Sequence, residues 1–502
     1  MIDHVVCEIG SSRQGVQERG NEPTPFDSQQ DAMDSEKTGI AIRRDALSTL
    51  LVRVVGIGLM FGSTVLTTRV LGPYEFGIYN AALALAMLLA TLAPLGTDRV
   101  LVRNLSVRPD LDHIGPEIAL SHRCTAVIAG LLIPACLISA MILTYVLDRP
   151  HLGLTAVLSI VMLVPLTVTY LRQWIAIPLI GTRKAVLPEQ VLFPLLSSGL
   201  MGLLIWRSQP MTAWTATIVH AAMTLGIWLF SLRTGPLQKA YSAAVHSHQS
   251  PIATVPDRLS EGMPFVWVAI GTILCQKCMP LVVAAGCGFA DTAHFSLAMM
   301  ITALPAIPLG ILNLSLVPQF ARLHSDGNLE GARLLGRRSA VATFLTALVV
   351  SMAIWFGRPI LLYFFDARYT LVIGLLPTLL LAAIVDCLTG PTIPVMQTMD
   401  MERNYSRALF TWIPIQLVMN YVLSRYLEAD GAAIGYLLGR CLWNVMVVVL
   451  IYRRHGFVML PTFDLPSLPG LPRRPALAVR DSSSASVFPE SFPGGQESSA
   501  AA

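Results

Sequence analysis

Long apolar runs separated by short polar connections dominate the chain. About twelve of them approach the roughly 20 residues that an α-helix needs to cross a bilayer. The apolar residues are continuous rather than alternating, which favours helices over the strands of a closed barrel. The runs are Leu47–Val70, Phe76–Gly96, Cys124–Leu147, Leu154–Ile180, Leu187–Trp206, Trp214–Leu232, Phe265–Gly286, Thr292–Val317, Val341–Phe356, Leu371–Met396, Ala408–Leu427 and Ala432–Ile451. The pattern predicts an all-α, polytopic membrane protein with about twelve transmembrane helices.

The composition agrees with this prediction and excludes several functions. The chain is 54% hydrophobic and 13% charged, whereas a soluble domain has about 25% charged residues. A net charge of +4 is too small to indicate a nucleic-acid partner. The sequence Cys275-Gln276-Lys277-Cys278 has the spacing of a metal or redox motif but lacks a second pair. We therefore expect no metal, no cofactor and no catalytic residue.

The connections predict the organisation and the orientation. Residues 233–263 contain several Pro, Ser and His residues and are predicted to form a cytoplasmic linker between two six-helix lobes, 47–232 and 264–454. The polar ends, 1–46 and 455–502, are predicted to be disordered tails. Arg and Lys gather on alternate connections, beginning with 98–123. By the positive-inside rule, both termini are then cytoplasmic.

Two short motifs flank the second predicted helix. In the first, Gly72-Pro73 allows a tight turn between adjacent antiparallel helices. In the second, Leu95-Gly96 ends a helix with a glycine stop. The first motif consists of Arg69, Leu71, Gly72, Phe76, Gly77 and Tyr79, and the second of Pro94, Leu95, Gly96, Asp98 and Arg103.

These motifs resemble those of bacterial polysaccharide flippases, a branch of the multidrug/oligosaccharidyl-lipid/polysaccharide exporter superfamily. A weaker third match is Asn313, Pro318 and Ala321, and the resemblance extends over residues 47–454. It implies a flippase of the bacterial inner membrane that translocates oligosaccharides linked to polyprenyl pyrophosphate. The implied partners are this lipid-linked substrate, membrane lipids, and the polysaccharide polymerase or export machinery.

Three ionisable residues stand out within the apolar runs, where charge is costly and usually marks function. Arg53 and Lys277 are the candidate cations of a lumen that pairs with the substrate phosphates. Arg53 could instead extend its side chain to the lipid headgroups. Asp386 is a candidate for ion coupling or for a structural ion pair with Lys277.

Asp98, Arg99 and Arg103 lie at the cytoplasmic end of the second helix. They either anchor the loop at the membrane surface or pair with one another in a cytoplasmic gate.

The prediction is therefore an alternating-access flippase that moves a lipid-linked oligosaccharide through a cationic lumen. One alternative is a multidrug or small-molecule exporter of the same superfamily, which predicts an acidic, aromatic-lined cavity. A second is a membrane enzyme that polymerises or ligates polysaccharide. It predicts a long external loop, but the external connections are no longer than about fifteen residues on this assignment of spans.

Overall fold

The computed structural model describes residues 25–107, 111–207, 211–233, 235–246, 254–263, 266, 274, 278–365 and 367–461, with side chains of the first helix from residue 52 onward. The described residues form helices and connections without a β-strand. The helices of the first half are α2 (Pro25–Leu92), α3 (Thr97–Val107), α4 (Leu111–Met141), α5 (Pro150–Ile180), α6 (Thr182–Leu187), α7 (Phe193–Trp206), α8 (Ala213–Ser231) and α9 (Gly235–His246). Those of the second half are α11 (Met279–Gly286), α12 (Phe289–Thr302), α13 (Ile307–Ser325), α14 (Leu329–Phe356), α15 (Arg358–Phe364), α16 (Leu371–Leu388), α17 (Thr392–Thr398) and α18 (Glu402–His455).

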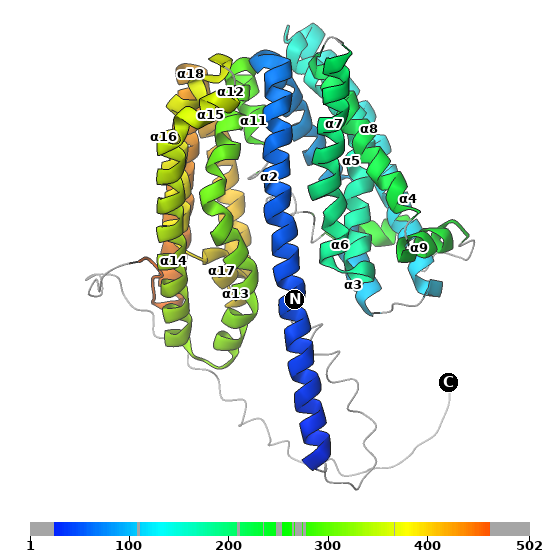
Figure 1. The fold of residues 1–502 in the computed structure, drawn as a ribbon, viewed down its shortest axis with the longest axis vertical. Coiled ribbons are helices and arrows are strands. Elements are labelled where there is room, and N and C mark those ends of the chain that lie inside the picture. Colours follow the sequence, from blue (N-terminus) through cyan, green and yellow to red (C-terminus); the bar gives the residue numbers. More distant parts are fainter. Residues whose placement is uncertain are drawn as a thin grey trace, which may run out of the picture. The chain divides into compact units, whose positions relative to one another are not determined.

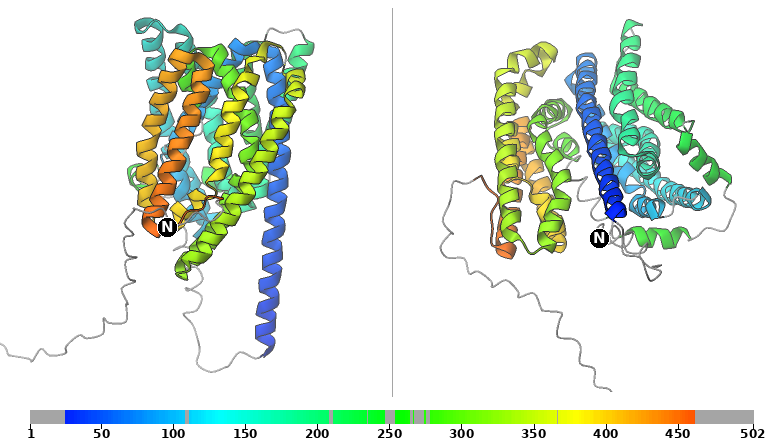
Figure 2. Two further views of the ribbon diagram at one scale, coloured as in Figure 1. Left: turned by 90° about the vertical axis from the view of Figure 1, so that its left-hand side faces the viewer. Right: turned by 60° about the horizontal axis from the view of Figure 1, so that its bottom comes forward.

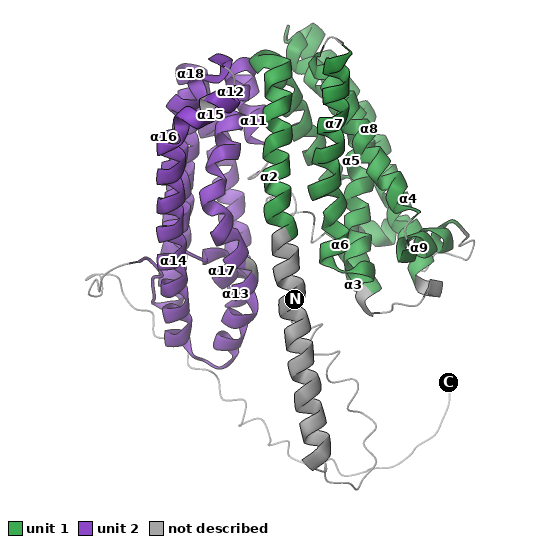
Figure 3. Ribbon diagram, viewed as in Figure 1, with its two compact units in different colours: residues 1–270 green, residues 271–502 purple. Residues whose placement is uncertain are grey.

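The chain divides into two compact units, 1–270 and 271–502 (Figure 3). Within the described residues, nine helices are long and apolar enough to span a membrane. Two of these, α2 and α18, each contain a break and so account for two predicted runs apiece. The seventh predicted run, Phe265–Gly286, is described only in part, from α11 onward. The predicted all-helical, polytopic architecture is confirmed.

The break in α2 lies at the predicted Gly72-Pro73 turn. Gly72 has φ 75° and ψ 169°, a conformation that glycine adopts without a steric penalty. Pro73 follows where a helix begins and a backbone N–H is not needed. The helix then ends at Leu92, and the positive φ angles of Leu95 (47°) and Gly96 (76°) direct the chain into α3. The predicted Gly72-Pro73 turn is therefore present, and the second helix ends shortly before the predicted Leu95-Gly96 stop.

The break in α18 lies at Leu427 and Glu428, and the two arms of the helix then pack side by side (Figure 2). The amide of Gln416 donates a hydrogen bond of 3.2 Å to the carbonyl of Gly435. The indole of Trp412 donates one of 2.8 Å to the carbonyl of Gly439. Glycines at such crossings let two helices approach closely, and polar side chains of one arm then donate to backbone carbonyls of the other.

The predicted linker 233–263 is partly helical. It contains α9 and a second helical segment at 255–263, and both belong to the first unit. On α9, Leu237 and Ala240 are each 1% exposed and pack in one cluster with Ile114 and Ile118 of α4. Leu237, Ala240, Tyr241 and Ala244 have the spacing of an amphipathic helix, so the sequence contained this signal.

The predicted tail boundaries also differ from the helix ends. Helix α2 begins at Pro25, within the range 1–46 that was predicted to be a disordered tail. At the other end, Phe457 and Met459 lie within the predicted tail 455–502 but are buried in the hydrophobic core of the second unit. Gly336 of α14 makes room for Met459, because a β-carbon on it would lie 2.4 Å from the Met459 sulfur. Apolar residues just after the last helix thus belong to the fold.

Candidate functional site: ionisable clusters in each unit

Helices α3, α6 and α9 lie near one another at one end of the first unit (Figure 1), and several ion pairs of the unit involve α3 or the segment 254–263. We call this the α3 end of the unit. Here the chain leaves α2 through the Leu95-Gly96 turn, and the helical segment 254–263 returns to the same turn. A β-carbon on Gly262 would lie 2.6 Å from the Leu95 carbonyl oxygen and 3.0 Å from the Thr97 amide nitrogen. Glycine is therefore needed at 262 for this close approach.

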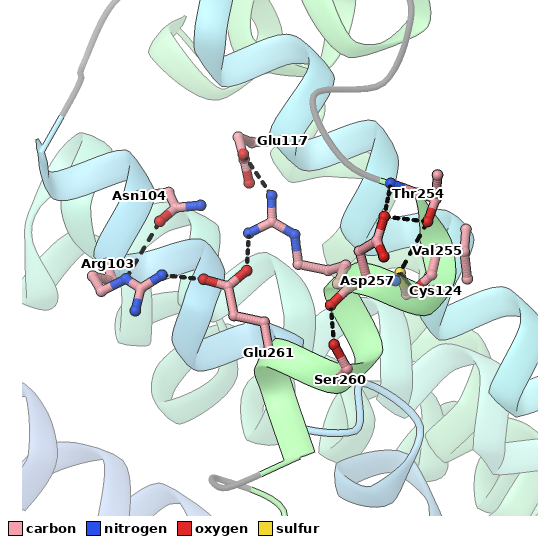
Figure 4. Close-up of polar contacts among 10 residues, drawn as sticks. Arg103, Asn104, Glu117, Cys124, Thr254, Val255, Asp257, Ser260 and Glu261 are labelled. Carbon is pink, nitrogen blue, oxygen red and sulfur yellow. Dashed lines mark hydrogen bonds and ion pairs between the residues drawn. The ribbon is translucent and has the colours of Figure 1, made fainter. Parts of the chain in front are cut away.

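A buried ion pair holds segment 254–263 against α4. The guanidinium of Arg258 donates from Nη2 to Oε1 of Glu117 at 2.6 Å, and the two side chains are 3% and 8% exposed. Arg258 also pairs with Glu261 on its own segment at 3.4 Å (Figure 4). Breaking a buried pair by removing one partner costs about 3–5 kcal/mol, because the other charge is left without compensation. This contact is therefore the firm attachment of the segment.

A second, exposed ion pair joins the same segment to α3. Arg103 donates to Glu261, and their side chains are 45% and 40% exposed (Figure 4). Exposed pairs of this kind contribute at most about 1 kcal/mol. Glu261 thus links a weakly held arginine, Arg103, to the firmly held Arg258.

Asp98 and Arg99 make separate contacts with α5. Asp98 is 4% exposed and accepts a hydrogen bond of 3.3 Å from the Tyr170 hydroxyl. Burial raises the pKa of the Asp98 carboxyl above its usual value, against the opposing charge of Arg99. The Arg99 guanidinium lies 4.1 Å from the ring centre of Trp174, and its Nε is 3.7 Å from Asp98. The three predicted gate residues lie at one end of the unit. Asp98 lies beside Arg99, but Arg103 pairs with Glu261, and an Asp98–Arg103 pair is not among the described ion pairs.

The first unit also contains a buried ion pair that the sequence interpretation missed. Arg172 of α5 is 1% exposed and donates from Nη2 to the Ala185 carbonyl at 2.7 Å and to Glu189 at 2.6 Å. Arg172 lies inside the predicted run Leu154–Ile180 and could have been noticed as an ionisable residue in an apolar run. Its pairing with Glu189 could not have been predicted, because Glu189 belongs to a different helical segment.

Of the two predicted lumen cations, the structure describes one. The Nε atom of Arg53 is buried and has no hydrogen-bond partner among the described residues. Gly56, one turn after Arg53, packs against Gln190: a β-carbon added to Gly56 would lie 2.8 Å from the β-carbon of Gln190. Arg53 thus lies near the chain segment that carries Glu189. Lys277 lies outside the described residues, and so does its predicted pairing with Asp386.

Among the described residues of the second unit, Asp386 contacts Arg440 and Asn444. Its Oδ2 lies 3.4 Å from Nε of Arg440 on α18, and its Oδ1 accepts a hydrogen bond of 2.7 Å from Asn444. Arg440 also donates from Nε and Nη2 to the Tyr436 hydroxyl at 3.0 and 2.8 Å. Thr389 completes the cluster by donating to Asn444 at 2.6 Å. Arg440 lies inside the predicted run Ala432–Ile451, but the sequence interpretation did not consider it.

The comparisons with known proteins agree with this architecture. The chain matches the family model described as polysaccharide biosynthesis protein over residues 42–324. The comparison with curated proteins found no match.

In the described part of the chain, no group of three or more His, Cys, Asp or Glu side chains is placed to hold a metal ion.

Solved structures of transporters share the fold. One is the inward-facing conformation of a multidrug resistance MATE family transporter of the MOP superfamily, with a TM-score of 0.63, 16% identity, and coverage of 82% of this chain and 98% of the other. Another is a MOP superfamily transporter from Pyrococcus furiosus, with a TM-score of 0.55, 14% identity, and coverage of 83% and 95%. At such identities the likeness concerns the fold alone. Because the family model covers more than half of the chain, the protein belongs to the polysaccharide biosynthesis protein family and has the fold of MOP-superfamily transporters.

Proposed function

We propose that the protein is a flippase that translocates oligosaccharides linked to polyprenyl pyrophosphate across the bacterial inner membrane. The observation that carries the proposal is the combination of a polysaccharide-biosynthesis sequence with a transporter fold. A membrane transporter in such a pathway needs a substrate that is made on one side of the membrane and used on the other. A lipid-linked sugar unit meets this requirement. The enzymes that polymerise or export the product are then its functional partners.

The ionisable residues within the helices support an anionic substrate. A diphosphate and its sugar hydroxyls lose their water in the bilayer, which costs free energy unless protein groups replace that water. Arg53 has a buried Nε atom without a partner among the described residues, so it can offer a donor to a phosphate. Arg172, in contrast, is already paired with Glu189. We therefore retain Arg53 and Lys277 as the proposed cations of the lumen, which alternating access exposes to each side in turn.

Asp386 is assigned a structural role in this proposal. Its contacts with Arg440 and Asn444 satisfy both carboxylate oxygens. Of the two predicted roles, ion pairing and ion coupling, these contacts support the first. The partner described is Arg440; the predicted pairing with Lys277 lies outside the described residues and stays a prediction.

The α3 end is assigned to the cytoplasm, with both chain termini on that side. The connections of this end contain Arg99, Arg103, Arg183 and Lys184, and basic residues concentrate on cytoplasmic loops. The exposed Arg103–Glu261 pair is then the proposed cytoplasmic gate contact, because a pair worth at most about 1 kcal/mol can open readily. Arg258 stays attached to Glu117 when that contact opens.

The proposal can be tested by complementation of a strain that lacks its flippase for a lipid-linked oligosaccharide. The expected result is restored surface polysaccharide and loss of the lipid-linked intermediate that accumulates on the cytoplasmic face. Arg53→Gln should reduce the restoration, whereas Arg183→Gln, which removes the same charge from an exposed position, should not. Failure of the normally expressed parent chain to restore polysaccharide with any lipid-linked substrate would contradict the proposal.

A second candidate is export of drugs or other small molecules, which the likeness to a multidrug resistance transporter favours. It predicts that expression lowers the susceptibility of a drug-sensitive host and leaves lipid-linked intermediates unchanged. The same strains, assayed for both outcomes, separate the two functions.

A further inference from the structure

Two arginines on α3 lie one helical turn apart on the same side of the helix. Arg99 and Arg103 have side chains that are 47% and 45% exposed. Residues four apart on a helix have β-carbons about 5–6 Å from each other. Both guanidinium groups can therefore reach one ligand of the size of a diphosphate.

Arg99 is held in position by an aromatic ring instead of a close carboxylate. Its guanidinium lies over the ring of Trp174, and Trp174 in turn makes an edge contact with Tyr170, with ring centres 6.0 Å apart. The distance of 3.7 Å from Arg99 Nε to Asp98 is longer than a hydrogen bond. Stacking fixes the plane of a guanidinium and leaves its edge, which holds the N–H donors, directed outward. Arg99 is thus oriented without a strong acceptor among its described contacts.

Arg103 is held by an acceptor that an anion can replace. Its partner Glu261 is 40% exposed and is also shared with Arg258. If Arg103 moves from Glu261 to an anionic ligand, Glu261 remains paired with Arg258, so no charge is left isolated. The buried Arg258–Glu117 pair has no such freedom. Arg103 can therefore exchange Glu261 for an anionic ligand, whereas Arg258 stays paired with Glu117.

We propose that Arg99 and Arg103 form a capture site for the diphosphate group of the lipid-linked substrate, with Glu261 as its internal competitor. The inference rests on the proposed function and names the residues that first receive the substrate. Each guanidinium can bind a phosphate through two N–H groups, a geometry in which arginine is stronger and more specific than lysine. Trp174 acts as a positioning residue for Arg99.

The test measures equilibrium binding of polyprenyl diphosphate to the full chain in nanodiscs made without anionic lipid. Arg99→Gln and Arg103→Gln should each weaken binding about tenfold or more. Glu261→Gln should have the opposite effect and tighten binding by up to about fivefold, because it removes the competing acceptor. Arg183→Gln, at an exposed position on α6, is the control and should bind as the parent does.

Three further measurements distinguish a diphosphate capture site from a structural cluster and from a site for lipid headgroups. Trp174→Leu should weaken binding, whereas Trp174→Tyr, which keeps a ring under Arg99, should restore it. Weaker binding for Glu261→Gln would show that Glu261 only supports the local structure and would overturn the proposal. Arg99→Gln and Arg103→Gln could also weaken the binding of polyprenyl monophosphate, or of phosphatidylglycerol added to the nanodiscs, as much as they weaken binding of the diphosphate. That result would indicate a site for lipid headgroups and would also overturn the proposal.

The outcome can be distinguished from failure of the proposed function. If the Arg99 and Arg103 variants bind the diphosphate as the parent does while the parent restores polysaccharide in cells, the capture site is wrong and the flippase function stands. If the parent neither binds polyprenyl diphosphate nor restores polysaccharide, the function itself is wrong.

Discussion

Replacing Arg258 with methionine should release segment 254–263 from the first unit. Arg258 and Glu117 are 3% and 8% exposed, and the replaced guanidinium supplies the hydrogen bond of 2.6 Å to Glu117 Oε1. The other oxygen of Glu117, Oε2, already has no partner among the described residues. The substitution therefore leaves a buried carboxylate without a donor, which costs about 3–5 kcal/mol. At about 1.4 kcal/mol per factor of ten, the detached population should rise roughly 100-fold or more.

Cys124 is a built-in reporter of this detachment. It is 0% exposed, and its sulfur lies 4.0 Å from the carbonyl oxygen of Val255 at the start of the segment. In a chain in which the other cysteines are replaced with alanine, the rate of maleimide labelling measures how often the segment lifts away. We expect the Arg258→Met variant to be labelled roughly 100-fold faster than its parent.

Two control variants distinguish the buried pair from its exposed neighbour. Arg103→Met removes a pair worth at most about 1 kcal/mol, so labelling should rise by no more than about fivefold. The double variant Glu117→Leu/Arg258→Met removes both buried charges and should return close to the parental rate, because an apolar pair of similar volume fits such a site. Parental labelling of a folded Arg258→Met chain would refute the assignment of this ion pair as the attachment.

Three other predictions concern the second unit, the Leu95-Gly96 turn and pH. Arg440→Met should lower the midpoint of thermal unfolding in detergent more than the double variant Asp386→Asn/Arg440→Met, because only the single variant leaves the Asp386 carboxylate without its cation; equal midpoints would argue against the pair. Gly262→Ala should lower the midpoint because its β-carbon would lie 2.6 Å from the Leu95 carbonyl oxygen, whereas Gly58→Ala, with nothing within 4 Å, should not. The folded-state pKa of Asp98 is raised above its usual value of 3.8, so its contribution to stability is fully present below that value and is lost as pH rises through the folded-state pKa. The stability of Asp98→Asn relative to the parent should therefore increase as the pH rises above 3.8, and a constant difference in unfolding midpoints would contradict this.

The membrane-spanning architecture could be predicted from the sequence because the bilayer constrains each helix locally. A continuous apolar run of sufficient length must form a helix in lipid, whatever its neighbours are. The Gly72-Pro73 and Leu95-Gly96 turns were predictable for a similar reason, since positive φ angles and helix starts favour particular residues. The family resemblance depended on these same local motifs, and the family model confirms it.

The partners of the charged residues could not be predicted in the same way. Arg258 and Glu117 are separated by 141 positions in the chain, and no local pattern indicates that they meet. Arg172 and Arg440 were visible within their apolar runs, but which carboxylates would accept them depends on how the helices pack. The contact of Asp386 with Arg440 is likewise a product of packing, because the two residues lie on different helices, α16 and α18.

The sequence by itself thus determined that the chain is a polytopic bundle of membrane-spanning helices, because that is set by the transfer free energy of each segment. Only the tertiary structure decided which charges are neutralised internally and which stay accessible. A buried charge must find a partner wherever the packed helices supply one, and that choice separates the fixed Arg258 from the exposed Arg99 and Arg103.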